Sequence, residues 1–320
     1  MKRHLLVFFC ALAVGAAQAD PVRLVFVGDI MLDDGPGQVI AAGRDPLAYF
    51  AAPLADADYT IGNLECPIAT VGQPFDNKIF SFRAHPRALP LLKGRFDALA
   101  VANNHSGDYG PAAFLETLTQ LDRAGIARFG GGRDLAAAHA PLWIVRQGLH
   151  IAVLGFNEYK PRSFEAGPEQ PGIAWSEDSQ VVADIRAARA AGADLVIPFM
   201  HWGWERESEP SDRQRQLART MIDAGADVVV GGHPHVTQGA EYYKGHLIVY
   251  SLGNFVFDGF DFPAGRRGWL LRLTLNRDGL LAWETQAAQI DDEGTPHPVP
   301  AALTPCGNAP VAEVRMCANP

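Results

Sequence analysis

The sequence has little cysteine, no excess of basic charge, and no long apolar run beyond its first 19 residues. Lys and Arg number 27 against 36 Asp and Glu, for a net charge of −9 at pH 7. Because nucleic-acid-binding proteins usually present a basic face, this balance argues against a nucleic-acid partner. The apolar runs 195–200 and 227–232 are far shorter than the ~20 residues that a spanning helix needs.

The N-terminus has the pattern of a secretory signal peptide. Lys2 and Arg3 precede an apolar core at residues 5–17, and small residues at 17–19 form a cleavage site before Asp20. The alternative is an uncleaved membrane anchor, for which this core is short. We therefore predict a signal peptide at residues 1–19 and a periplasmic or secreted mature protein.

Three of the 4 cysteines remain after such cleavage. Cys306 and Cys317 flank a short loop and can form a disulfide in an oxidising compartment, which leaves Cys66 unpaired and buried. Residues 20–290 have the composition of one large domain, and residues 291–320 form a Pro- and Ala-rich tail that we expect to be extended or irregular.

Short β-branched runs alternate with helical patterns along the chain, which indicates an α/β protein. The expected strands are 22–27, 58–62, 98–102, 194–200 and 226–230, with a hairpin at 142–154 and further strands at 247–250, 269–275 and 280–289. The expected helices are 86–93, 111–124, 181–191 and 211–224, of which the second and fourth end at glycines.

Polar side chains follow five of the predicted strands. They are Asp29, Glu65, Asn104, His105, His201, His233 and His235. Ligand sites of open α/β sheets lie at the carboxyl ends of the strands, so we expect these groups at one sheet edge. Each one alone is more typical of a cap or turn residue. Together, carboxylate, amide and imidazole groups suit one or two divalent Mn, Fe or Zn ions.

Two further expectations concern this edge. Pro234 fixes its own φ and favours an extended conformation for His233, which makes the linker between the two histidines stiff. His105, directly after Asn104, is placed to act as a general acid toward a leaving group.

An ordered set of motifs runs along the chain: Gly-Asp-Ile-Met-Leu (28–32), Gly-Asn-Leu-Glu (62–65), Asn-Asn-His (103–105), Asp-Tyr-Gly (108–110), His-Trp-Gly (201–203), Gly-His-Pro-His (232–235) and Tyr-Ser-Leu-Gly-Asn-Phe (250–255). In this order the motifs resemble the poly-γ-glutamate capsule biosynthesis proteins of the CapA type, which are related to calcineurin-like metallophosphoesterases. The resemblance implies a four-layer α/β/β/α sandwich, with two mixed sheets and helices on both outer faces.

The resemblance also implies a division of the metal ligands. One ion would take Glu65, Asn104, His201 and His233, and a second would take Asp29, Glu65 and His235. The histidine that completes the second site in metallophosphoesterases is replaced here by Met31, and a thioether is a poor ligand for Mn or Zn. The side chains expected to support these ligands are Asn63, Asn103 and Asn254.

The implied partner is an anionic cell-envelope polymer such as poly-γ-glutamate, together with membrane proteins of capsule synthesis. Candidate substrate-binding residues are Lys78, Arg83 and Arg206, with His85 in the same segment as the first two. Lys160 and Arg162 are further candidates, but they lie in a loop and fit solvated surface at least as well. Trp202 and Trp204 are expected to pack in the core. Two hypotheses stay open, namely a metal-dependent hydrolase or transferase and a non-catalytic protein of polymer binding, export or assembly.

Overall fold

The computed structural model describes residues 20–76, 78–159, 162–299 and 304–305. The predicted signal peptide, Lys160, and the cysteines at 306 and 317 lie outside these residues. Among the helices that the structure describes, none is both long and apolar enough to cross a membrane.

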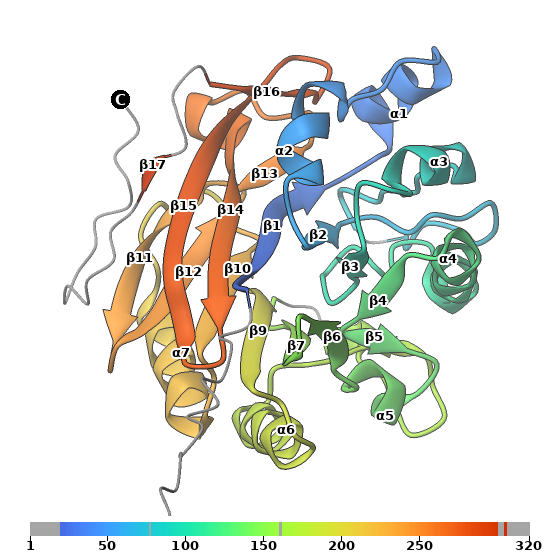
Figure 1. The fold of residues 1–320 in the computed structure, drawn as a ribbon. Coiled ribbons are helices and arrows are strands. Elements are labelled where there is room, and N and C mark those ends of the chain that lie inside the picture. Colours follow the sequence, from blue (N-terminus) through green and yellow to red (C-terminus); the bar gives the residue numbers. More distant parts are fainter. Residues whose placement is uncertain (1–19, 77, 160–161, 300–303, 306–320) are drawn as a thin grey trace, which may run out of the picture.

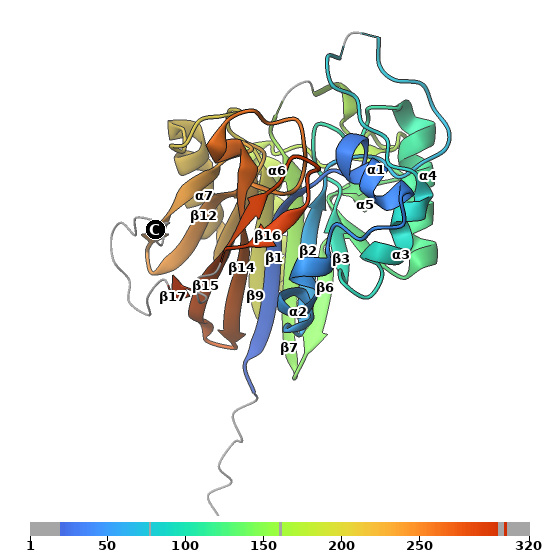
Figure 2. The same ribbon diagram turned by 90° about the horizontal axis from the view of Figure 1, so that it is seen from above.

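The larger sheet is mixed and contains the first strand of the chain. Its order is β16 (Pro296–Pro298), β15 (Gly279–Ile290), β14 (Arg267–Asn276), β1 (Val22–Ile30), β2 (Tyr59–Leu64), β3 (Ala98–Ala100) and β4 (Ala127–Phe129). β1 to β4 are parallel, whereas β14 and β15 are antiparallel to their neighbours. β13 (Asn254–Val256) pairs with β1, and β17 (Thr304–Pro305) pairs with β15. The start of the predicted tail is therefore extended and joins this sheet as β16 (Figure 2).

The smaller sheet is also mixed. Its order is β11 (Thr237–Tyr243), β12 (His246–Leu252), β10 (Val228–Gly232), β9 (Leu195–His201), β7 (Leu149–Asn157) and β6 (Leu142–Arg146). β6 and β7 form the predicted hairpin, and β7 then pairs in parallel with β9. A small separate pairing joins β5 (Gly131–Gly132) and β8 (Gly172–Ile173).

Alternation along the strands explains why the two sheets stack. In β1, Leu24 and Phe26 belong to the hydrophobic cluster between the sheets, whereas Val25 and Val27 belong to the cluster under the outer helices. In β10, Val229 faces a third cluster on the opposite side from its two neighbours. Strands that are apolar on both faces must be covered on both faces, so each sheet lies between the other sheet and a helical layer.

The helices form the two outer layers. Those on the larger sheet are α1 (Asp34–Ala41), α2 (Ala51–Ala55), α3 (Leu89–Leu92) and α4 (Gly110–Ala124). Those on the smaller sheet are α6 (Asp178–Ala190) and α7 (Asp212–Ala224), while α5 (Leu135–Ala138) lies near β5. Figure 1 shows α1 to α4 on one side of the sheets and α6 and α7 on the other. The predicted four-layer sandwich is confirmed.

The helix ends follow the sequence signals. Ser211 caps α7 in a capping box with Gln214, and α7 and α4 stop at Gly225 and Gly125, whose φ values are 115° and 75°. The helix predicted at 86–93 is broken into a 3-10 turn, η2 (Pro86–Ala88), and the short α3. Pro90 lacks an N–H group, so it fits only a new first turn. Further 3-10 turns are η1 (Ala48–Phe50), η3 (Arg162–Phe164) and η4 (Pro263–Arg266).

Candidate metal centre

The polar groups predicted at one sheet edge come instead from two sheets. Asp29, Glu65 and Asn104 lie at or beyond the ends of β1, β2 and β3 in the larger sheet. His201 ends β9, and His233 and His235 follow β10, in the smaller sheet. The apolar patterns of the strands are alike in both sheets, so these patterns do not indicate which strand belongs to which sheet. The carboxyl ends of both sets of strands meet, and the side chains converge between them.

The first set of ligands is compact around His201. Its Nε2 atom lies 2.7 Å from Oδ1 of Asn104, 3.0 Å from Nδ1 of His233 and 3.3 Å from Oε1 of Glu65. Neighbouring ligands of an ion bound at about 2.1 Å are separated by about 3 Å. These four predicted ligands therefore have the spacing of a coordination sphere.

Glu65 is the group in this set whose burial as a charged side chain is most unfavourable in free energy. Its side chain is fully buried, and neither carboxylate oxygen has a hydrogen-bond partner among the described residues. Burial, and then the charge of Asp29, raise the pKa of Glu65 well above its ordinary value. A buried carboxylate without donors requires a proton or a cation. Glu65, His233 and His235 also offer ligand atoms that all lie within 4.8 Å of one another, so a divalent ion fits the donors that surround it.

The second set contains His235 and Asp29. Nδ1 of His235 lies 2.8 Å from Oδ1 of Asn254, whose amide nitrogen donates to the Gly265 carbonyl at 2.8 Å. Because the amide nitrogen is used in this way, its oxygen is the acceptor and Nδ1 of His235 carries the proton. Nε2 is then free as a ligand, 3.8 Å from Oε1 of Glu65. Asn254 thus holds His235 as predicted for a supporting residue.

The other two predicted supporting residues connect the sets. The Asn63 amide donates to Oδ1 of Asp29 at 2.8 Å and lies 3.3 Å from Nδ1 of His201. Asn103 donates to the Asn63 oxygen at 3.0 Å and accepts from the backbone N–H of His105 at 3.1 Å. One chain of amides therefore fixes groups from both sheets.

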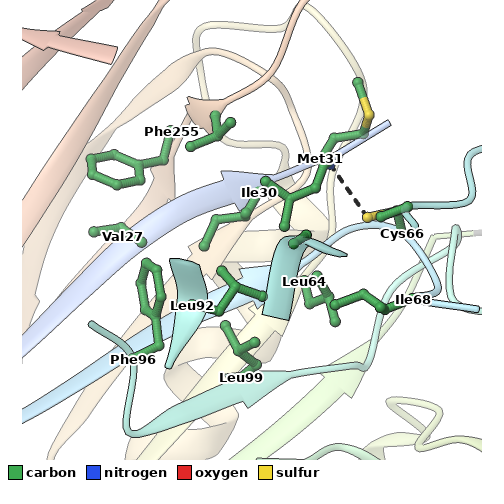
Figure 3. Packing of buried hydrophobic residues seen from close by; sticks show 14 of the residues in the cluster. Val27, Ile30, Met31, Leu64, Cys66, Ile68, Leu92, Phe96, Leu99 and Phe255 are labelled. Carbon is green, nitrogen blue, oxygen red and sulfur yellow. Dashed lines mark hydrogen bonds between the residues drawn. The ribbon is translucent and has the colours of Figure 1, made fainter. Parts of the chain in front are cut away.

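Met31 lies in the core rather than among donors. It is fully buried, and its sulfur accepts a hydrogen bond from the backbone N–H of Asp33 at 3.1 Å. Figure 3 shows it in the hydrophobic cluster with Ile30, Leu64 and Cys66. Cys66 is buried and unpaired as expected, and burial raises the pKa of its thiol to about 12.

His105 is held by Asp108 and Asn103, and its contact with Asp108 was not predicted from the sequence. Its Nδ1 atom lies 2.7 Å from Oδ2 of Asp108, which also accepts from the backbone N–H of Phe82 at 2.8 Å. Burial lowers the pKa of His105, and the hydrogen bond to Asp108 opposes this. Asp108 stands three positions after His105 within a quoted motif, and that spacing was the available signal.

Lys78 was predicted to bind substrate, but its ammonium group lies among protein acceptors. It donates to the Asn104 carbonyl at 2.7 Å, pairs with Asp108, and lies 3.1 Å from Nδ1 of His105. This contact ties the segment that contains Lys78 to the proposed acid. A role toward substrate stays a prediction.

The turn between the histidines differs from the prediction. His233 and His235 have φ values of 97° and 55°, so His233 is not extended as the following proline favours. Its backbone N–H donates to Oδ2 of Asp29 at 3.2 Å, and its ring is fully buried. These contacts outweigh the local preference. Gly232 permits the approach, because a Cβ atom there would lie 2.9 Å from Oδ1 of Asp29.

The other basic candidates are placed differently from one another. Arg83 donates to the Val71 and Gly72 carbonyls, each at 3.2 Å, and stacks on Tyr109. Arg162 pairs with Glu165 and Glu177, which agrees with the surface alternative. His85 accepts from the backbone N–H of Arg87 at the start of η2. Arg206 is exposed, with its guanidinium 5.2 Å from the centre of the Phe262 ring.

The two tryptophans after β9 differ in burial. Trp202 is fully buried, as predicted, and its ring nitrogen donates to the Tyr250 carbonyl. The prediction that Trp204 packs in the core was wrong, since it is 65% exposed. The φ of 86° at Gly203 between them turns the chain outward, so the second indole leaves the core.

Residues 23–259 match the family described as bacterial capsule synthesis protein PGA_cap. The chain belongs to this family, which confirms the resemblance drawn from the motifs. It is 35% identical over 286 residues to the PGA biosynthesis protein CapA of Bacillus subtilis (strain 168), covering 88% of this chain and 74% of that protein. It is 32% identical over 300 residues to the capsule biosynthesis protein CapA of Bacillus anthracis, covering 89% and 71%.

Similarity to solved structures is weaker. The Haemophilus influenzae NAD nucleotidase NadN aligns with 90% of this chain and 50% of its own, at a TM-score of 0.45 and 13% identity. We infer nothing about activity from a similarity at this level.

Proposed function

We propose that this chain is an exported protein of bacterial capsule synthesis that acts on an anionic cell-envelope polymer of the poly-γ-glutamate type. The reaction would be a metal-dependent hydrolysis or transfer at a bond of the polymer, with Mn, Fe or Zn as cofactor and membrane proteins of capsule synthesis as partners. Membership of the capsule synthesis family and the printed names of the relatives from two Bacillus species support the polymer class.

The observation that carries the enzymatic part is the convergence on Glu65. Within the part of the chain that the structure describes, its buried carboxylate has no hydrogen-bond donor, and the imidazole and amide groups beside it have ligand spacing. Glu65, Asn104, His201 and His233 would hold the first ion, and Asp29, Glu65 and His235 a second. A divalent ion in such a site polarises the scissile group and activates water as a nucleophile at neutral pH.

His105 would supply the proton in this proposal. Asp108 accepts the hydrogen bond from Nδ1–H and so fixes the ring, and the doubly protonated ring would give the proton on Nε2 to the leaving group. The bond between the His105 backbone and Asn103 fixes the residue at its main chain as well. His105 is thus held both at its ring and at its main chain.

A second candidate function is a non-catalytic protein of polymer binding, export or assembly. The observation that favours it is Met31, whose sulfur is used inside the core where metallophosphoesterases place a metal-binding histidine. A single ion would then have a structural role, or the protein would function without an ion.

Metal analysis of the purified mature protein tests the enzymatic proposal, because that proposal requires a bound ion whereas the second function does not. We expect about one equivalent of transition metal in the unmodified protein and its loss in His233→Ala, because the ligands come preassembled. His150→Ala, an exposed histidine on β7, is the matched control and should keep the metal. Less than about half an equivalent in the unmodified protein would contradict the enzymatic proposal.

Turnover then tests the acid. Hydrolysis of an aryl phosphate or of a γ-glutamyl oligomer should fall about 100-fold in His105→Ala if His105 protonates the leaving group. Turnover that survives this change would remove the proposed role, even if metal is present.

A further inference from the structure

One short segment after β9 reaches both histidines of the 233–235 turn. The backbone N–H of Arg206 donates to the Pro234 carbonyl at 2.8 Å, which places residues 203–206 directly against this turn. Trp204 meets Tyr159 edge to face at 6.4 Å, and the centre of the Tyr159 ring lies 3.9 Å from that of His233. The segment is therefore continuous with the proposed metal centre on the His233 side.

On the other side the contact runs through Arg206. Its guanidinium lies 5.2 Å from the centre of the Phe262 ring, which is 5.8 Å from that of Phe260. Phe260 in turn lies 5.0 Å from the ring of His235. Two aromatic walls thus flank the turn, with Trp204 at the outer end of one and Arg206 at the outer end of the other.

The backbone at this place is strained. Gln147 and Lys244 have positive φ values in turns that precede glycines, which is ordinary for hairpins. Arg206, His233 and His235 have φ values of 68°, 97° and 55° and lie together, outside any hairpin turn. Unfavourable backbone conformations persist where the surrounding structure enforces them, and they gather at ligand sites. The segment is consequently held in place before a ligand arrives.

Arg206 differs from the arginines of the neighbouring helix α7. Arg213, Arg215 and Arg219 each pair with carboxylates, whereas Arg206 has no ion pair among the described residues. A guanidinium that stacks on an aromatic ring keeps its N–H edge free for a carboxylate. An indole that is 65% exposed offers an apolar face beside it. The guanidinium and the indole together are chemically complementary to a polymer chain in which carboxylates alternate with methylene groups.

Glu205 lies between these two residues and its negative charge acts on the metal centre. Burial raises the pKa of Tyr159 and the charge of Glu205 adds to this, while the raised pKa of Glu65, caused mainly by burial and by Asp29, receives a small contribution from Glu205. An anionic chain would be repelled by Glu205 in the metal-free protein, and a divalent ion would reduce this repulsion. Binding of a polycarboxylate should therefore strengthen when metal is present.

We propose that Trp204 and Arg206 form a subsite that holds a polycarboxylate chain beside the metal centre. Arg206 binds a carboxylate of the chain, and the Trp204 indole packs on the methylene groups that follow. The inference rests on the polymer class in the proposed function, but it does not require that the protein be catalytic.

The test is equilibrium binding of a γ-linked glutamate oligomer to the mature protein, with and without Mn²⁺. We expect Arg206→Asn to weaken binding about tenfold or more, the range for a hydrogen bond to a charged group. Asn tolerates the left-handed backbone of this position, so the fold is preserved. Trp204→Ala should weaken binding several-fold and remove the change in tryptophan fluorescence that we expect when the oligomer is titrated into the unmodified protein. Arg206→Lys should keep part of the affinity that Arg206→Asn loses.

Arg186→Ala on α6 and Trp143→Ala on β6 are matched exposed controls that should leave affinity unchanged. Equal affinity in Arg206→Asn and Arg186→Ala would overturn the subsite, as would no binding of the oligomer. Tighter binding of an uncharged N-acetylglucosamine oligomer through Trp204 would overturn the polycarboxylate class. If Arg206→Asn loses binding of the oligomer while the unmodified protein contains no metal and shows no turnover, the subsite is supported and the hydrolase proposal fails.

Discussion

The two halves of the proposed metal centre would share Glu65 but differ in the spacing of their side chains. Around His201, the distances to its neighbours Asn104, His233 and Glu65 run from 2.7 to 3.3 Å. At His235, the ligand atom Nε2 lies 3.8 Å from Oε1 of Glu65, and the nitrogen that lies 3.5 Å from Oδ2 of Asp29 is the protonated Nδ1. The looser half is also the one where Met31 stands in place of a histidine. The comparison indicates that the side chains around His201 have the spacing of metal ligands and that those around His235 are farther apart.

The largest effect is expected from Glu65→Gln, because this residue is common to both halves. It removes a ligand charge without changing the volume, so metal affinity should fall more than about 100-fold, beyond the loss typical of a supporting residue. Titration of Mn²⁺ into metal-free protein measures this, with exposed Glu177→Gln as control. Tight binding retained in Glu65→Gln would show that the halves do not share the residue.

Asn254→Ala should act on the looser half alone. Loss of its hydrogen bond frees the His235 ring, and supporting residues of this kind are typically worth 10- to 100-fold in metal affinity, so we expect about 10-fold. The affinity of the His201 half should stay unchanged. If both halves weaken equally in a two-site titration, the halves are not independent.

Met31→His is designed to make the two halves alike. An imidazole there supplies the ligand type that the second half lacks, so the number of tightly bound ions should rise from about one to two. Met31→Leu, which keeps the core apolar, is the control and should leave the stoichiometry at one. An unchanged count in a folded Met31→His protein would mean that this position does not face the second site.

A separate effect concerns the stability of the metal-free protein. The pKa of Glu65 is raised, so the folded state holds this proton more tightly than the unfolded chain. The free energy of unfolding should therefore fall as the pH rises above 4.5, the ordinary value for Glu65, by at most about 1.4 kcal/mol per pH unit. Denaturant unfolding between pH 5 and 8 measures it.

Two histidines act in the opposite sense. Burial lowers the pKa of His201 and His233 well below 6.5, so they favour folding as the pH rises toward that value. Comparison of the unmodified protein with Glu65→Gln cancels their contribution. A stability difference that does not grow with pH would contradict the buried, proton-binding carboxylate.

Much of the fold and of the candidate site was accessible from the sequence, for identifiable reasons. Strand ends, helix caps and the ordered motifs are local signals, and they located each proposed ligand. The division of the ligands between two sheets depends on stacking, which strand patterns alike in both sheets do not encode. Contacts across the chain were also hidden. Lys78 meets Asp108 from 30 positions away, and the bond from His233 to Asp29 overrides the preference set by Pro234.

The most direct test of the asymmetric centre is Mn²⁺ titration of three metal-free proteins, namely the unmodified chain, His233→Ala and His235→Ala. The structure predicts one tight equivalent in the unmodified protein, kept in His235→Ala and lost in His233→Ala. Equal loss in both variants, or loss in His235→Ala alone, would contradict the assignment of the complete half-site to His233.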